Sequence, residues 1–223
     1  MKEVAVLGLG DFGMALVRAL QANKVRVLAV DLDESRVESV RNEIKHVVVA
    51  DMTQATALQQ LGLRDMDAVV VATSEPLATS VLAVLRLKDL GVQRIIAKAE
   101  NEDHAKVLRA LGVSDVVIPE NDSAVRLANK ISWTNVVEMV ALSPGYAIME
   151  LSPPAAVVGK TLRTSRLRED FRVEVLAIRE GAGAPLEAIP TADRVITRGC
   201  TVVVFGADED LARLRKESAV EGT

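Results

Sequence analysis

The sequence predicts an α/β protein in which a doubly wound parallel sheet is followed by a smaller α+β module. Up to about residue 134, short apolar segments alternate six times with segments of helical periodicity, as in a parallel sheet with crossover helices. The apolar segments are almost unbroken runs of Val, Leu, Ile and Ala, which are typical of strands buried on both faces. Beyond Asn135, predicted strands follow one another directly, so we place a second, α+β module there.

The first predicted strand, residues 4–7, leads into a turn with the pattern Gly-x-Gly-x-x-Gly. In this pattern Gly8 permits a tight turn, Gly10 lets the backbone approach a phosphate, and Gly13 lets the next helix pack closely on the strand. The helix N-terminus offers unpaired N–H groups and the positive end of its dipole to an anion. We therefore predict a Rossmann-like nucleotide site, to which Asp11 and Phe12 also belong.

The second predicted strand, residues 25–30, ends on Asp31, which follows the glycine turn at the spacing of about 20 residues that dinucleotide-binding folds use. A carboxylate at this place accepts both hydroxyls of a ribose and repels a 2′-phosphate. The pattern therefore predicts an adenosine-bearing nucleotide other than NADP, and it leaves ATP, ADP, AMP and NAD open. We assign Leu32, directly after Asp31, to the same site.

The other elements of the first module follow from periodicity, capping residues and glycine or proline stops. The buried face of the first helix is expected to consist of Ala15, Leu16, Ala19 and Leu20. Thr53 is expected to cap the third helix, and Asp122 or Ser123 the sixth. The remaining expected strands are 46–50, 68–72, 94–99 and 116–118, and the remaining expected helices are 34–43, 54–61, 76–90, 102–111 and 123–133.

Polar side chains follow the later strands at their carboxyl ends, where open parallel sheets bind ligands. Asp51 follows the third strand, Thr73 the fourth and Glu120 the sixth, while Lys98 lies near the end of the fifth. Asp51 could serve only as a helix cap, but its place beside the crevice favours a role in ligand binding. We assign Asp51, Thr73 and Lys98 to the nucleotide site, whereas for Glu120 the strand end alone favours ligand binding and a surface role about equally.

In the second module, residues 136–142 and 147–151 are predicted strands on either side of a Ser143-Pro144-Gly145 turn. A helix at 162–168, strands at 173–178 and 201–205, and a helix at 208–216 are expected, with a flexible stretch at 181–185. We place the domain boundary between residues 134 and 135. A module of this size has only a marginal core of its own, so we expect it to pair with a second copy of the chain.

Composition excludes several classes of function. The net charge of −4 gives no electrostatic footprint for nucleic acid. The single cysteine, Cys200, forbids an internal disulfide and suits a reducing compartment such as the cytoplasm. No apolar run reaches the roughly 18 residues that a membrane span needs. We therefore expect a soluble protein whose role at a membrane, if it has one, requires a partner.

Short motifs occur in a characteristic order along both modules. They are GLGDFG (8–13), the single Asp31, ADMT (50–53), KAEN (98–101), DHAKVLRALG (103–112), IPEND (118–122), VGKTL (158–162) and VLAIREG (175–181). In this order they resemble the RCK-type regulatory subunits of bacterial Trk/Ktr potassium-uptake systems. The similarity extends over essentially the whole chain, whose length is similar to that of the single-copy Ktr-type subunit.

The resemblance implies an N-terminal RCK domain that binds an adenine nucleotide (ATP, ADP or AMP, with NAD or NADH as second choice) and a C-terminal RCK domain. Subunits of this kind form homodimers that assemble into a cytosolic ring, expected here to be an octamer. The ring docks on a membrane-embedded potassium transporter at the cytoplasmic face of the cell membrane. Nucleotide binding is then expected to shift the conformation of the ring and so to gate the transporter.

The resemblance also implies roles for single residues. The glycines of the turn cradle the phosphates, and Asp51 and Met52 lie by the adenine. Lys98 lies near the phosphates, and Glu120 meets their end through a divalent cation. In the second module, Arg168 is the candidate for binding a second-messenger dinucleotide, cyclic di-AMP.

Asp11 departs from the family pattern, which often has arginine at this place in the glycine turn. A carboxylate cannot pair with a phosphate, and it repels one unless a cation lies between them. ADP, AMP or NAD, or a metal ion between Asp11 and a phosphate, therefore suits this turn better than a directly bound triphosphate.

Two other functions remain as alternatives to a regulatory subunit. One is an NAD-dependent oxidoreductase, which is an enzyme, and the other is an NAD-linked redox sensor, which shares features with both. An oxidoreductase requires a positioned proton donor, usually His, Lys or Tyr. The second module has no histidine, and its only such residues are Lys160, Lys216 and Tyr146. We therefore expect a regulatory ligand-binding subunit without catalytic residues, and not an enzyme.

Overall fold

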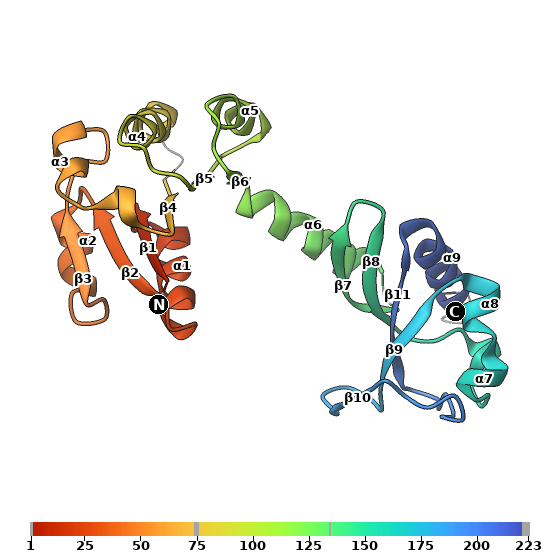
Figure 1. The fold of residues 1–223 in the computed structure, drawn as a ribbon. Coiled ribbons are helices and arrows are strands. Elements are labelled where there is room, and N and C mark those ends of the chain that lie inside the picture. Colours follow the sequence, from red (N-terminus) through yellow and green to blue (C-terminus); the bar gives the residue numbers. More distant parts are fainter. Residues whose placement is uncertain (1, 74–75, 134, 220–223) are drawn as a thin grey trace. The chain divides into compact units, whose positions relative to one another are not determined.

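The computed structural model describes residues 2–73, 76–133 and 135–219 (Figure 1). The chain divides into two compact units, Met1–Ser123 and Ala124–Thr223. The domain boundary expected between residues 134 and 135 falls on residue 134, which lies outside the described residues, and it stays a prediction. Among the described residues, no helix is both long enough and apolar enough to cross a membrane.

The first unit contains a sheet of six strands in the order β3-β2-β1-β4-β5-β6. The strands are β1 (Glu3–Leu7), β2 (Arg26–Asp31), β3 (His46–Val49), β4 (Ala68–Val71), β5 (Ile95–Lys98) and β6 (Asp115–Val117). All neighbouring pairs are parallel, so the predicted doubly wound sheet is confirmed. The winding direction reverses between β1 and β4, and the crevice at the carboxyl ends of such strands is where these sheets bind ligands.

Helices cover both faces of this sheet. The helices α1 (Asp11–Ala22) and α2 (Glu34–Val40) pack on the face that carries Val6, Ala29 and Val70. The opposite face carries Ala5 and Val69 and packs against α3 (Ala55–Gln59), the short 3₁₀ helix Leu63–Asp65, α4 (Leu77–Asp89) and α5 (Glu102–Ala110). Alternate residues of one strand thus enter two different apolar cores, which is why the strands read as almost continuous apolar runs.

The buried face of α1 was predicted partly wrongly. Gly13 and Val17 are the buried residues of this helix, and Leu16 and Leu20 are half-buried against the same core. The two alanines of the predicted face, at positions 15 and 19, are exposed. The helix approaches the sheet along the line from Gly13 to Val17, one turn apart, and the alanines point away from that line.

Two predicted helix starts are also wrong. Thr53 does not cap α3, whose N-cap is Gln54, because the Thr53 N–H and hydroxyl both donate to Asp51. Helix α6 (Pro119–Ser132) begins at Pro119 and not after Asp122 or Ser123, since a proline already has the φ angle that the first helical position needs. Glu120 therefore lies in the first turn of α6 and not in the loop before it.

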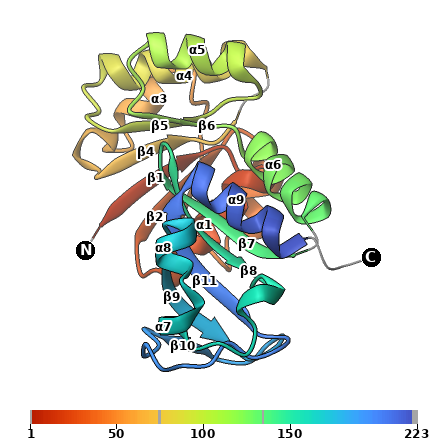
Figure 2. The same ribbon diagram turned by 90° about the vertical axis from the view of Figure 1, so that its right-hand side faces the viewer.

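The second unit contains an antiparallel sheet in the order β10-β9-β11-β8-β7. Its strands are β7 (Val136–Ser143), β8 (Tyr146–Leu151), β9 (Glu174–Arg179), β10 (Leu186–Ala188) and β11 (Thr201–Ala207). One face packs against α8 (Leu167–Phe171) and α9 (Asp208–Ala219), and the core between them contains Met149, Val202 and Leu211 (Figure 2). The predicted smaller α+β module is thereby confirmed.

Two details of the second unit differ from expectation. The helix expected at 162–168 is two short helices, α7 (Leu162–Ser165) and α8, because Arg166 between them has a left-handed backbone with φ 56°. The glycine-rich stretch expected to be flexible joins β9 to β10, an edge strand that the sequence did not predict. This strand has only three residues, Leu186-Glu187-Ala188, which are too few to show a strand by their periodicity.

Candidate functional site

The glycine turn after β1 has three glycines with three different surroundings. Gly8 has φ +104°, and its N–H donates to the Val30 carbonyl at 2.7 Å. A Cβ atom on Gly13 would lie 1.9 Å from the Gly8 carbonyl oxygen, so α1 can pack here only without a side chain. A Cβ atom on Gly10 would meet nothing within 4 Å. The fold itself thus requires Gly8 and Gly13, whereas Gly10 keeps the space in front of α1 open.

The open space lies at the N-terminus of α1. Gly10 is the N-cap of this helix, and among the described residues no side-chain hydrogen bond caps it. The first backbone N–H groups of a helix have no partner within the helix, and they carry the positive end of its dipole. An anion that approaches past Gly10 would meet these groups directly.

Asp31, at the end of β2, is 6% exposed and holds the glycine turn in place. Its Oδ2 accepts the Leu9 N–H at 2.6 Å and its Oδ1 accepts the Asp33 N–H at 2.9 Å. Arg36 places Nη1 3.7 Å from Oδ2. A carboxylate has about four acceptor sites, so Asp31 can still accept hydrogen bonds from a ribose. The sequence predicted that Asp31 binds a ribose, but it did not show that Asp31 also holds the glycine turn in place.

A cavity of about 470 Å³ lies at the carboxyl edge of the sheet, next to the start of α1. It is lined by Gly10, Asp11, Phe12, Ala72, Thr73, Lys98, Glu100 and Glu120. Six of these are predicted site residues that come from four different parts of the chain. Ala72 and Glu100 were not predicted, although Glu100 belongs to the KAEN motif two residues after Lys98.

Among the described residues, Lys98 is the only basic one that lines this cavity. Its Nζ lies 2.7 Å from Glu120 Oε1 and 5.9 Å from the centroid of the Phe12 ring. The hydrogen bond from Lys98 lowers the pKa of Glu120, so this carboxyl group stays ionised. The described part of the lining therefore carries three carboxylates, on Asp11, Glu100 and Glu120, against one ammonium group.

Asp51, Met52 and Leu32 do not line this cavity. Asp51 Oδ1 accepts the Thr53 N–H at 2.8 Å and its hydroxyl at 2.7 Å, and these bonds lower the pKa of Asp51. Met52 is buried, and Leu32 is exposed at the end of β2. These residues lie at the carboxyl ends of β2 and β3, which are neighbours in the sheet. A role beside an adenine stays a prediction for them.

The residues around Glu120 do not form a metal site by themselves. Among the described residues, no group of three or more His, Cys, Asp or Glu side chains is placed to hold a metal ion. Glu120 is bonded to Lys98. A cation at this end of the cavity would need further oxygen ligands from a bound nucleotide.

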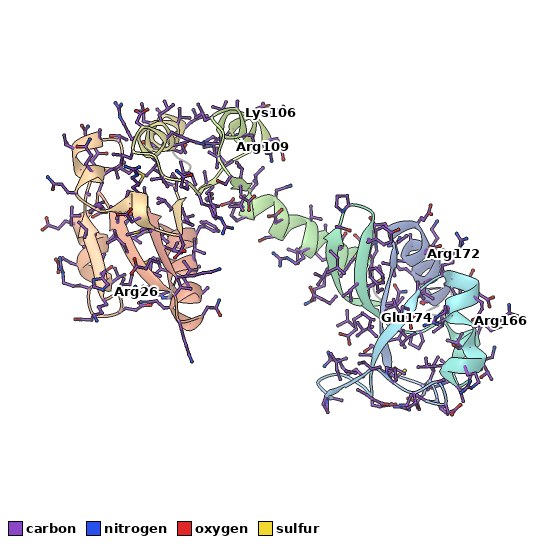
Figure 3. The ribbon with its side chains drawn as sticks, viewed as in Figure 1. Arg26, Lys106, Arg109, Arg166, Arg172 and Glu174 are labelled. Atoms are coloured by element: carbon purple, nitrogen blue, oxygen red, sulfur yellow. The ribbon has the colours of Figure 1, made fainter. Side chains whose placement is uncertain are left out.

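Arg168, the predicted second-ligand residue, lies in α8 and lines a separate cavity of about 320 Å³ in the second unit. Its guanidinium bonds to both carboxylate oxygens of Glu174, which raises the pKa of Arg168. Figure 3 labels Glu174 on β9, together with Arg166 and Arg172, which flank α8. The Arg168 guanidinium is thus already engaged by a carboxylate.

Comparison with known proteins identifies the family. Residues 4–119 match the TrkA-N domain and residues 146–219 match the TrkA-C domain. The chain belongs to the TrkA-domain family. The resemblance that the motifs predicted is thereby confirmed for both modules.

Two relatives match this chain over nearly their full length. The chain is 36% identical over 215 residues to Ktr system potassium uptake protein C of Bacillus subtilis (strain 168), covering 96% of each protein. It is 32% identical to Ktr system potassium uptake protein A of Vibrio alginolyticus, covering 96% of this chain and 97% of that protein. The chain therefore has the length of a single Ktr-type subunit.

The fold is also that of a solved RCK domain. The GsuK RCK domain superposes with a TM-score of 0.68 at 20% sequence identity, over 98% of this chain and 48% of that one. The chain thus spans about half the length of the GsuK chain. At this level of identity the likeness establishes the fold.

Proposed function

We propose that this chain is the nucleotide-binding regulatory subunit of a potassium-uptake system, and that nucleotide binding in its first unit gates a membrane-embedded potassium transporter. The observation that carries the nucleotide site is the open approach past Gly10 to the uncapped start of α1. Asp31, on the next strand, adds an acceptor suited to ribose hydroxyls. Membership of the TrkA-domain family, with Ktr potassium uptake proteins as relatives, supports the transport role.

The proposed ligand is an adenine nucleotide, with ADP or AMP favoured over ATP and NAD as second choice. The phosphates would lie against the N–H groups of α1, with Lys98 nearby. Asp11, Glu100 and Glu120 line the rest of this cavity. Each further phosphate of the nucleotide would therefore bring more negative charge toward carboxylates. A divalent cation would relieve this repulsion, with Glu120 and Asp11 as its protein ligands.

Charge reversal at Asp11 is expected to change which nucleotide binds best. In the Asp11→Arg variant, a repelling carboxylate becomes a guanidinium that can pair with a phosphate. The ratio of ATP to AMP affinity should rise by roughly fivefold, the effect of about 1 kcal/mol at a solvent-accessible charge pair. Calorimetric titration of both nucleotides measures it, with Asp11→Asn as the intermediate case. An unchanged ratio would mean that Asp11 points away from the phosphates.

Gating requires that ligand binding favour one of two conformations of an assembly. We propose that the chain forms a homodimer that assembles into a ring, with an octamer as the expected size, at the cytoplasmic face of the membrane. The support is a row of exposed apolar side chains on α6, in which Val125 is 53%, Leu127 57% and Ile131 70% exposed. A stripe of this kind is typical of a surface that a second chain covers.

The Ile131→Asp variant is expected to weaken the dimer and leave nucleotide affinity unchanged. A charge on Ile131, the most exposed member of the apolar row, would have to be desolvated when the second copy binds. Light scattering at a series of dilutions measures the dimer, and calorimetry measures the nucleotide affinity. Ile189→Asp is the matched control, because Ile189 is 88% exposed and lies on another part of the chain. A wild-type protein that is monomeric with nucleotide bound would contradict the ring.

The second unit is proposed to bind cyclic di-AMP, with Arg168 as a contact. Binding there would require Arg168 to exchange Glu174 for a phosphate. Glu174→Gln should therefore tighten such binding, because it removes the competing carboxylate.

We do not propose an enzymatic reaction. Tyr146 stacks on Phe205 with the ring centroids 5.9 Å apart, and Lys98 is bonded to Glu120. These contacts give both side chains a structural role.

Ion flux tests the proposed function directly. The chain is reconstituted in vesicles with the potassium-transporter subunit of its own system, and potassium uptake is measured with AMP, ADP, ATP or NAD added. Uptake should depend on this chain and should differ between nucleotides. GTP is the control for base specificity. Uptake that is the same with and without the chain would overturn the proposal.

A further inference from the structure

His104, in the first turn of α5, lies in a buried polar network next to Glu100, a residue that lines the cavity of the first unit. Its side chain is 1% exposed, and Ser80 of α4, beside it, is fully buried. The imidazole Nε2 lies 2.8 Å from the Ser80 hydroxyl oxygen, and Nδ1 accepts the Glu100 N–H at 3.3 Å. One ring thus joins two segments that are distant in sequence: the first turn of α4 and the loop after β5.

The partners of each atom fix the direction of these hydrogen bonds. The Ser80 hydroxyl donates to the Leu77 carbonyl at 2.9 Å, so it accepts from the imidazole. Nε2 therefore carries the proton, and Nδ1 is the acceptor for the Glu100 N–H. Burial lowers the pKa of His104, so the ring stays neutral. Each ring nitrogen has one partner, and the two partners lie on opposite sides of a rigid ring.

One of these segments lines the cavity, and the other begins a few residues after a lining residue. Glu100 lines it directly. Helix α4 begins at Leu77, shortly after Thr73, which also lines the cavity. The strands that precede the two segments, β4 and β5, are neighbours in the sheet. A movement of the cavity rim at Glu100 therefore has a direct hydrogen-bonded route to the start of α4.

We propose that His104 is a positioning residue that couples the nucleotide cavity to helix α4, holding Glu100 through Nδ1 and the first turn of α4 through Nε2. This inference rests on the proposed function, because it names the route by which occupancy of that site reaches a helix. An apolar residue would fill the same space without joining the two segments. The His104 imidazole therefore does more than fill space. Through its two hydrogen bonds, the position of α4 depends on the position of the cavity rim at Glu100.

Two substitutions separate the two connections. In His104→Asn, the shorter side chain keeps an acceptor oxygen near the place of Nδ1 and loses Ser80. In His104→Gln, the longer side chain keeps an amide donor near the place of Nε2 and gives up Glu100. Ser80→Ala removes the connection to α4 with a smaller change, and it should behave as His104→Asn does.

The test combines calorimetry with amide hydrogen exchange of the full chain, using AMP and ADP as probes. In the wild type, nucleotide should slow exchange in the first turns of α4. In His104→Asn and Ser80→Ala, the nucleotide affinity should stay close to that of the wild type while the response of α4 is lost. In His104→Gln, the affinity should fall by about fivefold or more, the size of a typical coupling between sites.

The outcomes separate the inference from the function it rests on. A wild type that binds none of the nucleotides would overturn the nucleotide site, and the inference with it. A wild type that binds and protects α4, together with Ser80→Ala and His104→Asn variants that respond in the same way, would overturn the coupling alone. Thermal unfolding of each variant identifies those that have lost the fold. If both His104 variants fail to fold, Ser80→Ala still tests the connection to α4.

Discussion

The Asp31→Ala variant is expected to lose most of its nucleotide affinity. Asp31 is buried, and its oxygens bond to the N–H groups of Leu9 and Asp33 while keeping acceptor sites for a ribose. A hydrogen bond to a charged group contributes about 1.5–3 kcal/mol, so each lost ribose contact should weaken binding by roughly 10- to 150-fold. Asp31→Asn should lose less, because one acceptor oxygen remains. Calorimetric titration with AMP and ADP measures the effect.

The same variant also disturbs the glycine turn, so its control has to separate the two effects. Glu38→Ala removes another acid from the segment that follows β2, one that is exposed and pairs with Arg41. It should bind nucleotide as the wild type does. An Asp31→Ala protein that is folded and keeps wild-type affinity would remove Asp31 from the site.

Gly13→Ala is expected to destabilise the first unit strongly, whereas Gly10→Ala should leave it folded and block the ligand. The added Cβ at Gly13 would lie 1.9 Å from a backbone oxygen, which cannot be relieved by turning a side chain. We expect the free energy of unfolding to fall by about 3 kcal/mol or more. At Gly10 the Cβ meets nothing within 4 Å, and the backbone there is extended with φ −69°. Its free energy of unfolding should change by about 0.5 kcal/mol or less.

The nucleotide affinity of Gly10→Ala is the informative value of this pair. The added methyl group occupies the space through which a phosphate reaches the N–H groups of α1, so affinity should fall by about tenfold or more. Denaturant unfolding and calorimetry of the same samples give both quantities. Wild-type affinity in Gly10→Ala would show that no phosphate passes close to this residue.

Much of the first unit could be predicted because its signals are local. Strands buried on both faces read as apolar runs, and the glycine turn and Asp31 have a fixed spacing along the chain. The carboxyl ends of parallel strands meet at one edge, so Thr73 and Lys98 could be assigned to the site from strand ends, while Glu120 was assigned through the family resemblance.

The parts that sequence reasoning missed depend on contacts between distant segments. The bond from the Leu9 N–H to Asp31 and the connection of His104 to Ser80 join residues of different strand–helix units, and no periodicity reports them. Helix α6 starts at Pro119, so Glu120 lies in its first turn, where it bonds to Lys98. The helix start predicted from the sequence was later and did not indicate this ion pair. The exposed Ala15 and Ala19 show that small apolar residues alone do not identify the buried face of a helix.

The central claim is that the first unit binds an adenine nucleotide other than NADP, and the identity of nucleotide carried by the purified protein tests it most directly. The protein is purified without added nucleotide and denatured, and the released small molecules are identified by mass spectrometry, with Gly10→Ala prepared in parallel. We predict that the wild type releases AMP, ADP, ATP or NAD and that Gly10→Ala releases much less. Recovery of NADP, or equal recovery of nucleotide from both proteins, would contradict the site described around Gly10 and Asp31.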